Sequence, residues 1–359
     1  NLSDEKRKRE LFDAAFELPD EQRAEFVLNA TRDAPSLGRA VLDLLTSMKS
    51  TTGPLDRPIQ PRVEREAQPP LNIGGYQVVR HIGSGGMGAV YACRDEHSGA
   101  VVAVKLIRST IDGPAAREHF EQERRILADL KHPNVCRLLD AGVSEQGEPF
   151  LVMDLIEGEP LDDYVKRTNP SLERRLLILS QALAGVEYFH RRNVIHRDLK
   201  PTNMLVTPRG VLRILDFGTA KMLERPLGAT GIGRTMTARP FLTFRYSSPE
   251  RLTGRVSGRS SDVYSLGVIA YELVSGRHPF ENECREGLQA LINAQAAGLP
   301  PAPANVPEPV GNAIRNALIA DPAGRYHSAA AFLEDVRRCL EGASVQPRFP
   351  AGVVRFQGQ

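Results

Sequence analysis

Apolar residues are spaced as in helices at both ends of the chain and mainly as in strands between them. Within residues 1–50, stripes at spacings of three and four residues predict helices, and Leu18-Pro19-Asp20-Glu21 is typical of a helix start. We expect three short helices that form a small all-α packing unit, in which nothing resembles a catalytic site. Residues 51–75 are rich in proline, which removes backbone donors and fixes φ, so they predict a linker.

Strand patterns dominate the next part of the chain, and helical patterns dominate the last part. The predicted strands cover residues 77–81, 89–94, 101–107, 137–141 and 150–155, with one helix at 115–131. The later predicted helices cover residues 172–191, 260–275, 286–297, 309–319 and 328–341. This order predicts an α+β protein with a strand-rich lobe (about 76–156), a helical lobe (about 157–341) and a cleft between them. Residues 342–359 remain as a C-terminal tail.

The composition is that of a globular protein with balanced charge. Its 46 basic and 44 acidic residues in 359 give a formal net charge of +2, which makes no electrostatic case for nucleic acid or a membrane surface. Cys93, Cys136, Cys284 and Cys339 lie far apart, without metal or redox spacing, so we expect reduced thiols. No apolar run has the length of a membrane helix, and no signal peptide opens the chain. We expect a cytoplasmic protein, which a segment beyond Gln359 could tether to the inner membrane.

The stretch with the most chemistry is His196-Arg197-Asp198-Leu199-Lys200-Pro201-Thr202-Asn203. It holds an acid, a base and an amide, which is more polarity than a core strand can bury unpaired, although a solvated loop would tolerate it. Farther along, an apolar run at residues 211–215 leads directly into Asp216-Phe217-Gly218. We therefore expect two carboxylates, those of Asp198 and Asp216, at neighbouring strand ends.

A glycine-rich motif, Gly83-Ser84-Gly85-Gly86-Met87-Gly88, lies between two predicted strands. The motif alone is a weak signal, because a flexible hairpin turn explains it equally well. A dinucleotide-binding fold would place a helix after the glycines. Here a strand follows, so the motif is better interpreted as a flap over phosphates.

A lysine ends the apolar run Val102-Ala103-Val104-Lys105 and would need a partner if it is buried. Glu123 lies on the predicted helix, on the same face as Phe120 and Leu127, whereas Glu121 lies on another face. We therefore interpret Glu123 as the partner of Lys105. The alternative is a surface glutamate in a charged run.

In this order, the motifs resemble those of eukaryotic-type protein kinases, and more narrowly the bacterial Hanks-type Ser/Thr kinases. The resemblance covers about residues 76–341, with the N-terminal helices as an extension. It implies the bilobal protein kinase fold, with a small antiparallel sheet lobe. It also implies transfer of the γ-phosphoryl group of ATP to Ser/Thr hydroxyls of protein substrates, with Mg²⁺ or Mn²⁺ as the metal ion.

The same resemblance assigns roles to charged residues. Asp198 would be the catalytic base, and Lys200 would steady the transferred phosphoryl group. Lys105, paired with Glu123, would hold the α and β phosphates of ATP. These groups suit the reaction, because phosphoryl transfer needs alignment and charge neutralisation more than a covalent nucleophile.

Further roles concern the metal, the hydroxyl substrate and the nucleotide. Asn203 and Asp216 would be metal ligands, since hard Mg²⁺ prefers oxygen donors. Thr243 with Lys200 resembles the Ser/Thr-specific arrangement rather than the tyrosine-specific one. The predicted nucleotide contacts are Ile82, Gly83, Ser84, Gly85, Gly86, Gly88, Val90, Ala103, Lys105, Met153, Asp154, Ile156 and Leu205.

The segment between Asp216 and Glu250 resembles the activation loop of the family. In the family, the arginine at the position of Arg197 binds a phosphate on this loop, and a guanidinium fork suits phosphothreonine. The candidate phosphorylation sites are Thr230, Thr235 and Thr237. We expect autophosphorylation at Thr235 or Thr237, in which a kinase homodimer could act in trans.

Two other functions stay open at this point. A pseudokinase or scaffold would bind partners without turnover, although every catalytic position is filled. A small-molecule kinase is disfavoured by Ser248-Pro249-Glu250 and by Arg325, which the resemblance pairs with Glu250. The resemblance also implies that Asp262 anchors the backbone of the catalytic loop.

Overall fold

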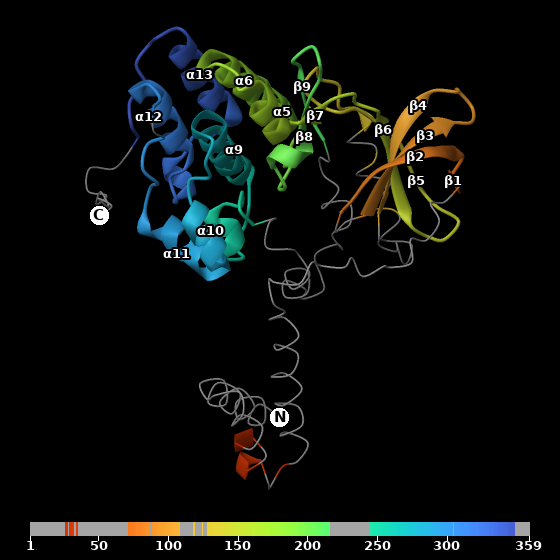
Figure 1. Cartoon of the computed structure of the whole chain (residues 1–359), viewed down its shortest axis with the longest axis horizontal. Coiled ribbons are helices and arrows are strands. Elements are labelled where there is room, and N and C mark those ends of the chain that lie inside the picture. Colours follow the sequence, from red (N-terminus) through yellow and green to blue (C-terminus); the bar gives the residue numbers. More distant parts are fainter. Residues whose placement is uncertain are drawn as a thin grey trace. The chain divides into compact units, whose positions relative to one another are not determined.

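Nearly all of the described structure belongs to one of two compact units of the chain. The computed structural model describes residues 26–27, 29–31, 34, 71–85, 88–107, 118, 124, 128–215, 244–303 and 305–348. The units are Asn1–Gln68 and Pro69–Gln359, and all labelled elements (Figure 1) belong to the second. In the first unit, residues 26–27 and 29–30 are helical. Most of the predicted three-helix unit lies outside the described residues, as does the linker up to residue 70.

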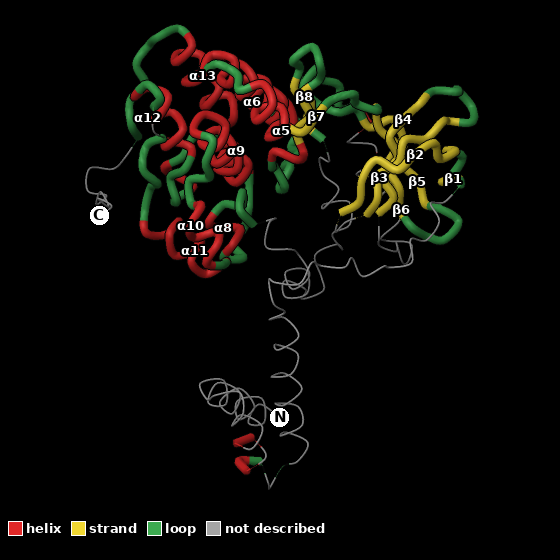
Figure 2. The backbone as a smooth tube through the Cα atoms, viewed as in Figure 1, coloured by secondary structure: helices red, strands yellow, loops and turns green. Residues whose placement is uncertain are grey.

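A six-stranded antiparallel sheet comes first, in the order β1-β2-β3-β4-β6-β5 (Figure 2). Its strands are β1 (Asn72–Ile73), β2 (Tyr76–Gly85), β3 (Gly88–Asp95), β4 (Val101–Ile107), β5 (Leu138–Val143) and β6 (Pro149–Asp154). All five predicted strands are confirmed, as β2 to β6. β1 lies in the segment interpreted as a linker, and two residues are too few to show alternation. Residues 118, 124 and 128, within the predicted helix at 115–131, are helical.

The two faces of this sheet bury different groups. One face carries a small apolar core made of Ile73, Cys93, Val102, Val104, Phe150 and Val152. The other face carries Lys105, which lies directly opposite Val90 on β3 and Leu151 on β6. Leu151 belongs to the larger core of the protein. Alternation along β4 therefore turns Val104 and Lys105 to opposite sides of the sheet.

Helices dominate the chain after β6. They are α5 (Leu161–Thr168), α6 (Leu172–His190), α8 (Pro249–Leu252), α9 (Arg259–Ser275), α10 (Glu281–Glu286), α11 (Leu288–Ala297), α12 (Glu308–Ala317) and α13 (Ala329–Leu340), with short 3-10 turns η1 (Pro201–Asn203) and η3 (Pro322–Gly324). A small sheet, β7-β8-β9, consists of β7 (Glu159–Pro160), β8 (Met204–Val206) and β9 (Leu212–Ile214). The long predicted helices are confirmed as α6, α9, α12 and α13, and so is the α+β class.

The helix predicted at residues 286–297 corresponds to α11, and the helix before it was not predicted. α11 begins at Leu288, two residues later than expected, whereas α10 covers residues 281–286 and ends at Glu286. Gly287 between them has a φ of 128°, a backbone conformation that glycine adopts readily and a helix cannot contain. Periodicity also misses α5 and α8, which are too short to repeat an apolar stripe clearly.

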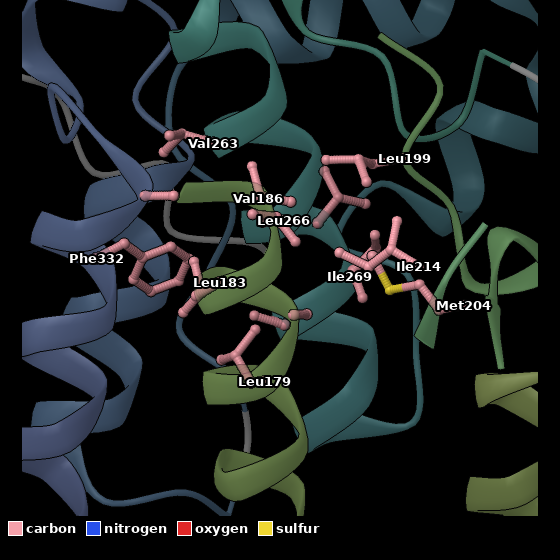
Figure 3. Packing of buried hydrophobic residues seen from close by; sticks show 14 of the residues in the cluster. Leu179, Leu183, Val186, Leu199, Met204, Ile214, Val263, Leu266, Ile269 and Phe332 are labelled. Atoms are coloured by element: carbon pink, nitrogen blue, oxygen red, sulfur yellow. The ribbon is translucent and has the colours of Figure 1, made fainter. Parts of the chain in front are cut away.

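Helix α9 is the central helix of the larger core. Every residue from Ser261 to Tyr271 is buried, which is typical of a helix surrounded by protein. Figure 3 shows side chains of α6, α9, α13 and the β8–β9 pair meeting here, among them Leu179, Leu183, Val186, Met204, Ile214, Val263, Leu266, Ile269 and Phe332. Ser171 and Ser328 cap the N-termini of α6 and α13 by accepting backbone N–H bonds. All four cysteines are free thiols.

The chain continues to pack on the helices after α13. Val345 is only 3% exposed, and its carbonyl accepts a hydrogen bond from Asn312 of α12 at 3.1 Å. Asn316, fully buried, donates to the Gln346 carbonyl at 3.0 Å and accepts from the Arg348 N–H at 2.7 Å. The Arg348 guanidinium lies 4.3 Å from the ring centroid of Tyr326. Residues 345–348, which the sequence places in the tail, thus belong to the packed domain.

Candidate active site

One buried carboxylate of α9 anchors the start of the stretch from His196 to Asn203. Asp262, 1% exposed, accepts hydrogen bonds from the backbone N–H groups of His196 and Arg197, each at 2.9 Å, and from His190 Nε2 at 2.9 Å. Burial alone would raise the pKa of Asp262, but these hydrogen bonds and the neighbouring imidazoles outweigh it and lower the pKa. Asp262 therefore stays ionised and anchors the loop, as expected. The backbone at Arg197 adopts a left-handed φ of 65°, which is strained for a residue other than glycine.

Within this loop, three predicted functional side chains converge. Lys200 Nζ lies 2.9 Å from Asp198 Oδ2. Asn203 Nδ2 donates to the Asp198 carbonyl at 2.8 Å and lies 3.3 Å from Asp198 Oδ2. Asp198 and Lys200 remain partly exposed, at 16% and 26% of their side-chain surface, whereas Asn203 is buried at 7%. The carboxylate of Asp198 is thus oriented by two neighbours and still accessible to a substrate.

The loop also fixes the residue that precedes Asp216. His196 Nδ1 accepts the N–H of Asp198 at 3.3 Å, so the proton of the neutral ring is assigned to Nε2, which donates to the Leu215 carbonyl at 2.9 Å. The Leu215 N–H in turn donates to the Asn203 carbonyl at 2.8 Å. Both backbone polar groups of Leu215 are therefore hydrogen-bonded to the stretch from His196 to Asn203. These bonds fix the position of the residue that directly precedes Asp216.

Most of the predicted nucleotide contacts on the sheet share the face that carries Lys105. Gly83 pairs with Val90, Val90 with Lys105, and Ala103 with Met153. Lys105 is 5% exposed, as the apolar run around it predicts. Ile156 and Met153 pack against the larger core, and Leu205 lies on β8, opposite Pro160. Ser84 is different, because it pairs with Ala89 and so belongs to the opposite face.

Two of the predicted nucleotide contacts are more restricted than the sequence suggests. At Gly88, with a φ of 151°, a Cβ atom would collide with the carbonyl oxygen of Leu106, so the glycine is required by the sheet itself. The N–H of Asp154 already donates to the Arg137 carbonyl at 3.1 Å. Of its two backbone polar groups, Asp154 therefore has only the carbonyl oxygen for a nucleotide, and this oxygen also accepts a hydrogen bond from the Cys136 thiol at 3.6 Å.

Residues 134–137 connect the sheet to β9, a role that the sequence did not predict for them. The Cys136 N–H donates to Ile214 at 2.8 Å, and the Ile214 N–H donates to the Asn134 carbonyl at 2.9 Å. The Asn134 side chain, 8% exposed, donates to Gln181 of α6 and to the Leu212 carbonyl, both at 3.0 Å. The sequence signal for these contacts is Gln181 within the apolar helix α6, because a buried glutamine side chain needs a hydrogen-bond partner.

The predicted pair of Glu250 and Arg325 is confirmed. Arg325 Nη1 and Nη2 donate to the two carboxylate oxygens at 2.9 and 2.8 Å, and Ser261 Oγ donates to Glu250 at 2.6 Å. Burial alone would raise the pKa of Glu250, but the bonds from Arg325 and Ser261 outweigh it and lower the pKa to about 2. Arg325 also lies 4.8 Å from the ring centroid of Tyr264.

Several predicted site residues lie outside the described residues, so their roles remain predictions. They are Gly86, Glu123, Asp216, Thr230, Thr235, Thr237 and Thr243. Next to Glu123, Arg124 forms an ion pair with Asp140 of β5 at 3.0 Å. This pair connects the predicted helix to the far edge of the sheet.

Comparison with known proteins agrees with this arrangement. Residues 76–335 match the family model described as "Protein kinase domain". The chain belongs to the protein kinase family. The matched domain is similar to those of bacterial Ser/Thr kinases, and the protein kinase family in general uses ATP and a divalent metal ion. In the described part of the chain, no helix has both the length and the apolar character needed to cross a bilayer.

Similar curated proteins are bacterial kinases. Serine/threonine-protein kinase PknA of Mycobacterium tuberculosis is 37% identical over 276 residues, which cover 75% of this chain and 62% of the relative. Pkn1 of Myxococcus xanthus is 35% identical over 74% of this chain and 39% of the relative. PrkC of Bacillus subtilis is 33% identical over 75% and 41%. The chain therefore spans less than two thirds of the length of these relatives.

A solved structure supports the fold. The chain resembles the crystal structure of a double mutant of the Mycobacterium tuberculosis PknI kinase domain, with a TM-score of 0.56 and 22% identity. The match covers 75% of this chain and 97% of the PknI chain. The bilobal kinase fold expected from the sequence is thereby confirmed.

Proposed function

We propose that this protein is an active Ser/Thr protein kinase that transfers the γ-phosphoryl group of ATP to serine or threonine hydroxyls of proteins, with Mg²⁺ and also Mn²⁺ as usable metal ions. The observation that carries the proposal is the arrangement of Asp198, Lys200 and Asn203 in a loop anchored by Asp262. A scaffold without turnover would not need an accessible, oriented carboxylate at this point.

The proposed mechanism gives each residue of the loop a separate task. Asp198 accepts a hydrogen bond from the substrate hydroxyl and takes its proton as the phosphoryl group is transferred. Lys200, already 2.9 Å from Asp198, places a positive charge beside the reacting oxygens. Lys105, held on β4 and paired with Glu123, binds the nucleotide phosphates.

The residues present fit a divalent metal ion. Both hydrogen bonds from Asn203 to Asp198 use the amide nitrogen, so the amide oxygen, the atom that Mg²⁺ prefers, is not consumed by them. Asn203 and Asp216 would hold the ion, which when bound would neutralise charge on the phosphates. Leu215 supports this assignment, because it joins the two ligand positions through its backbone bonds.

Regulation by phosphorylation of the activation loop is part of the same proposal. Arg197 directly precedes the catalytic base and would receive a phosphate from Thr230, Thr235 or Thr237, with autophosphorylation in trans within a homodimer. Incubation with ATP should add phosphate at Thr235 or Thr237, and peptide mass spectrometry that found neither modified would contradict this part.

The main test is Asp198→Asn, which keeps the shape of the side chain and removes its negative charge. Transfer of labelled phosphate from ATP to a generic basic protein should fall by roughly 10²- to 10⁴-fold, the usual contribution of a general base. Asp163→Asn serves as the matched control, since Asp163 lies on α5 with 59% of its side chain exposed. Equal rates for the Asp198→Asn variant and the wild type, in proteins with the same melting temperature, would refute the proposal.

A further inference from the structure

A hydrogen bond on β2 joins two side chains that a regular strand would keep apart. His81 Nε2 lies 2.8 Å from Ser84 Oγ. The two residues are three positions apart, and side chains at this spacing point to opposite faces of a regular strand. The local backbone must therefore depart from regular geometry between them.

The departure is a β-bulge at Ile82. His81 lies opposite Tyr91 and Gly83 lies opposite Val90, so Ile82 is the extra residue on β2 between consecutive residues of β3. A bulge of this kind reverses the alternation of side chains beyond it and re-aims them. It brings His81 and Ser84 to the same face, where their hydrogen bond becomes possible.

This face is the one turned away from Lys105. Gly83 pairs with Val90, which pairs with Lys105, whereas Ser84 pairs with Ala89 on the other face. His81 is held there by Tyr91, whose ring centroid lies 5.3 Å away in an edge-to-face contact at 63°. The Ser84 hydroxyl is thus bound on the face opposite Lys105.

We propose that His81 is a positioning residue that fixes the β2 part of the glycine-rich flap (Gly83–Gly85) for nucleotide binding by holding the Ser84 hydroxyl across the bulge at Ile82. The inference rests on the proposed function, in which this flap covers the phosphates of ATP. Glycine-rich segments lose much conformational entropy when they are ordered. A side-chain bond that orders the flap beforehand removes part of that cost from binding.

The expected effect is on nucleotide affinity and not on the chemical step. His81 stands on the face opposite Lys105 and is not placed to touch the reacting atoms. Its removal should raise the KM for ATP and the Kd for Mg·AMP-PNP by roughly three- to tenfold, the factor that one ordinary hydrogen bond supplies. The kcat should change by less than about twofold, because the interaction is made equally in the ground and transition states.

The experiment compares His81→Leu, His81→Gln, Ser84→Ala and the double variant His81→Leu with Ser84→Ala. Calorimetry measures the Kd for Mg·AMP-PNP, and steady-state kinetics gives KM for ATP and kcat separately. His81→Gln should restore affinity, since its amide can still bond to the hydroxyl. Ser84→Ala should match His81→Leu, and the double variant should be no weaker than either single variant. His97→Leu is the control, because His97 lies on the same lobe with a side chain that is 92% exposed.

The outcomes separate this proposal from its alternatives. Unchanged affinity in His81→Leu would overturn it. Weakened binding that Gln does not rescue, or additive effects in the double variant, would also overturn it, because the loss would then come from packing on Tyr91. A wild type that binds Mg·AMP-PNP but transfers no phosphate would refute the proposed function alone, and the calorimetric comparison would still decide the role of His81. A wild type that binds no nucleotide would refute both.

Discussion

At the scale of single residues, Arg197 combines a strained backbone with a position next to Asp198, the proposed catalytic base. Its φ is 65°, and its N–H must reach Asp262 Oδ1 at 2.9 Å. Arg197→Gly and Arg197→Ala remove the same guanidinium, but only alanine keeps the penalty of a left-handed backbone. We expect the glycine variant to be more stable by about 1 kcal/mol. Urea unfolding of the two variants measures this difference, and equal stability would show that the backbone is not strained there.

The ion pair of Glu250 with Arg325 should make stability depend on pH. The folded-state pKa of Glu250 is about 2, below its ordinary 4.5, so the folded state binds fewer protons between these values than the unfolded state does. The contribution is therefore complete above about pH 5 and is lost as the pH falls toward 2. Glu250→Gln should cost on the order of 3 kcal/mol at pH 7.

The check is the free energy of unfolding of the wild type and Glu250→Gln as a function of pH. The difference between the two proteins should shrink steadily below pH 5, because protonation removes from the wild type the charge that the variant lacks. Parallel curves down to pH 3 would contradict the assignment. Glu308→Gln is a suitable control, since Glu308 is an exposed residue in the first turn of α12.

At the scale of elements, sequence periodicity predicted the long helices and strands and missed the short ones and the irregular positions between or within them. α6 and α9 repeat apolar positions over several turns, and β4 was placed to the residue. β1, α5 and α8 contain too few residues for a period, and the break at Gly287 depends on one φ angle. The bulge at Ile82 depends on the register between two strands, which no single-strand pattern contains.

The segment after α13 gives a prediction at this scale. A chain ending at Gly342 loses the buried Val345 side chain and leaves the amide of Asn316 without its partners from the tail. The expected loss is about 2–4 kcal/mol, from one buried valine and one unsatisfied buried amide. A chain ending at Arg348 keeps these contacts and is the control. Similar thermal unfolding of the two truncated proteins would contradict the prediction.

At the scale of the whole kinase domain, the site is joined by backbone bonds that sequence motifs do not encode. The motifs predicted Lys105, Asp198 and Asn203 because each is chemically unusual for its surroundings. They could not predict that Asn134 and Cys136 connect β9 to the segment before β5, since those bonds use main-chain groups. The sequence therefore predicts which groups react, and the structure adds the backbone bonds that join the segments carrying them.

The burial of α9 has a consequence for how such a protein can diversify. Asp262 fixes the catalytic loop from a helix that is enclosed by α6, α12 and α13, so the geometry around Asp198 depends on residues that solvent does not reach. Exposed positions on α10 and α11 can then change without disturbing the loop that Asp262 anchors. The surface of the domain can thus vary while the buried support of the loop stays the same.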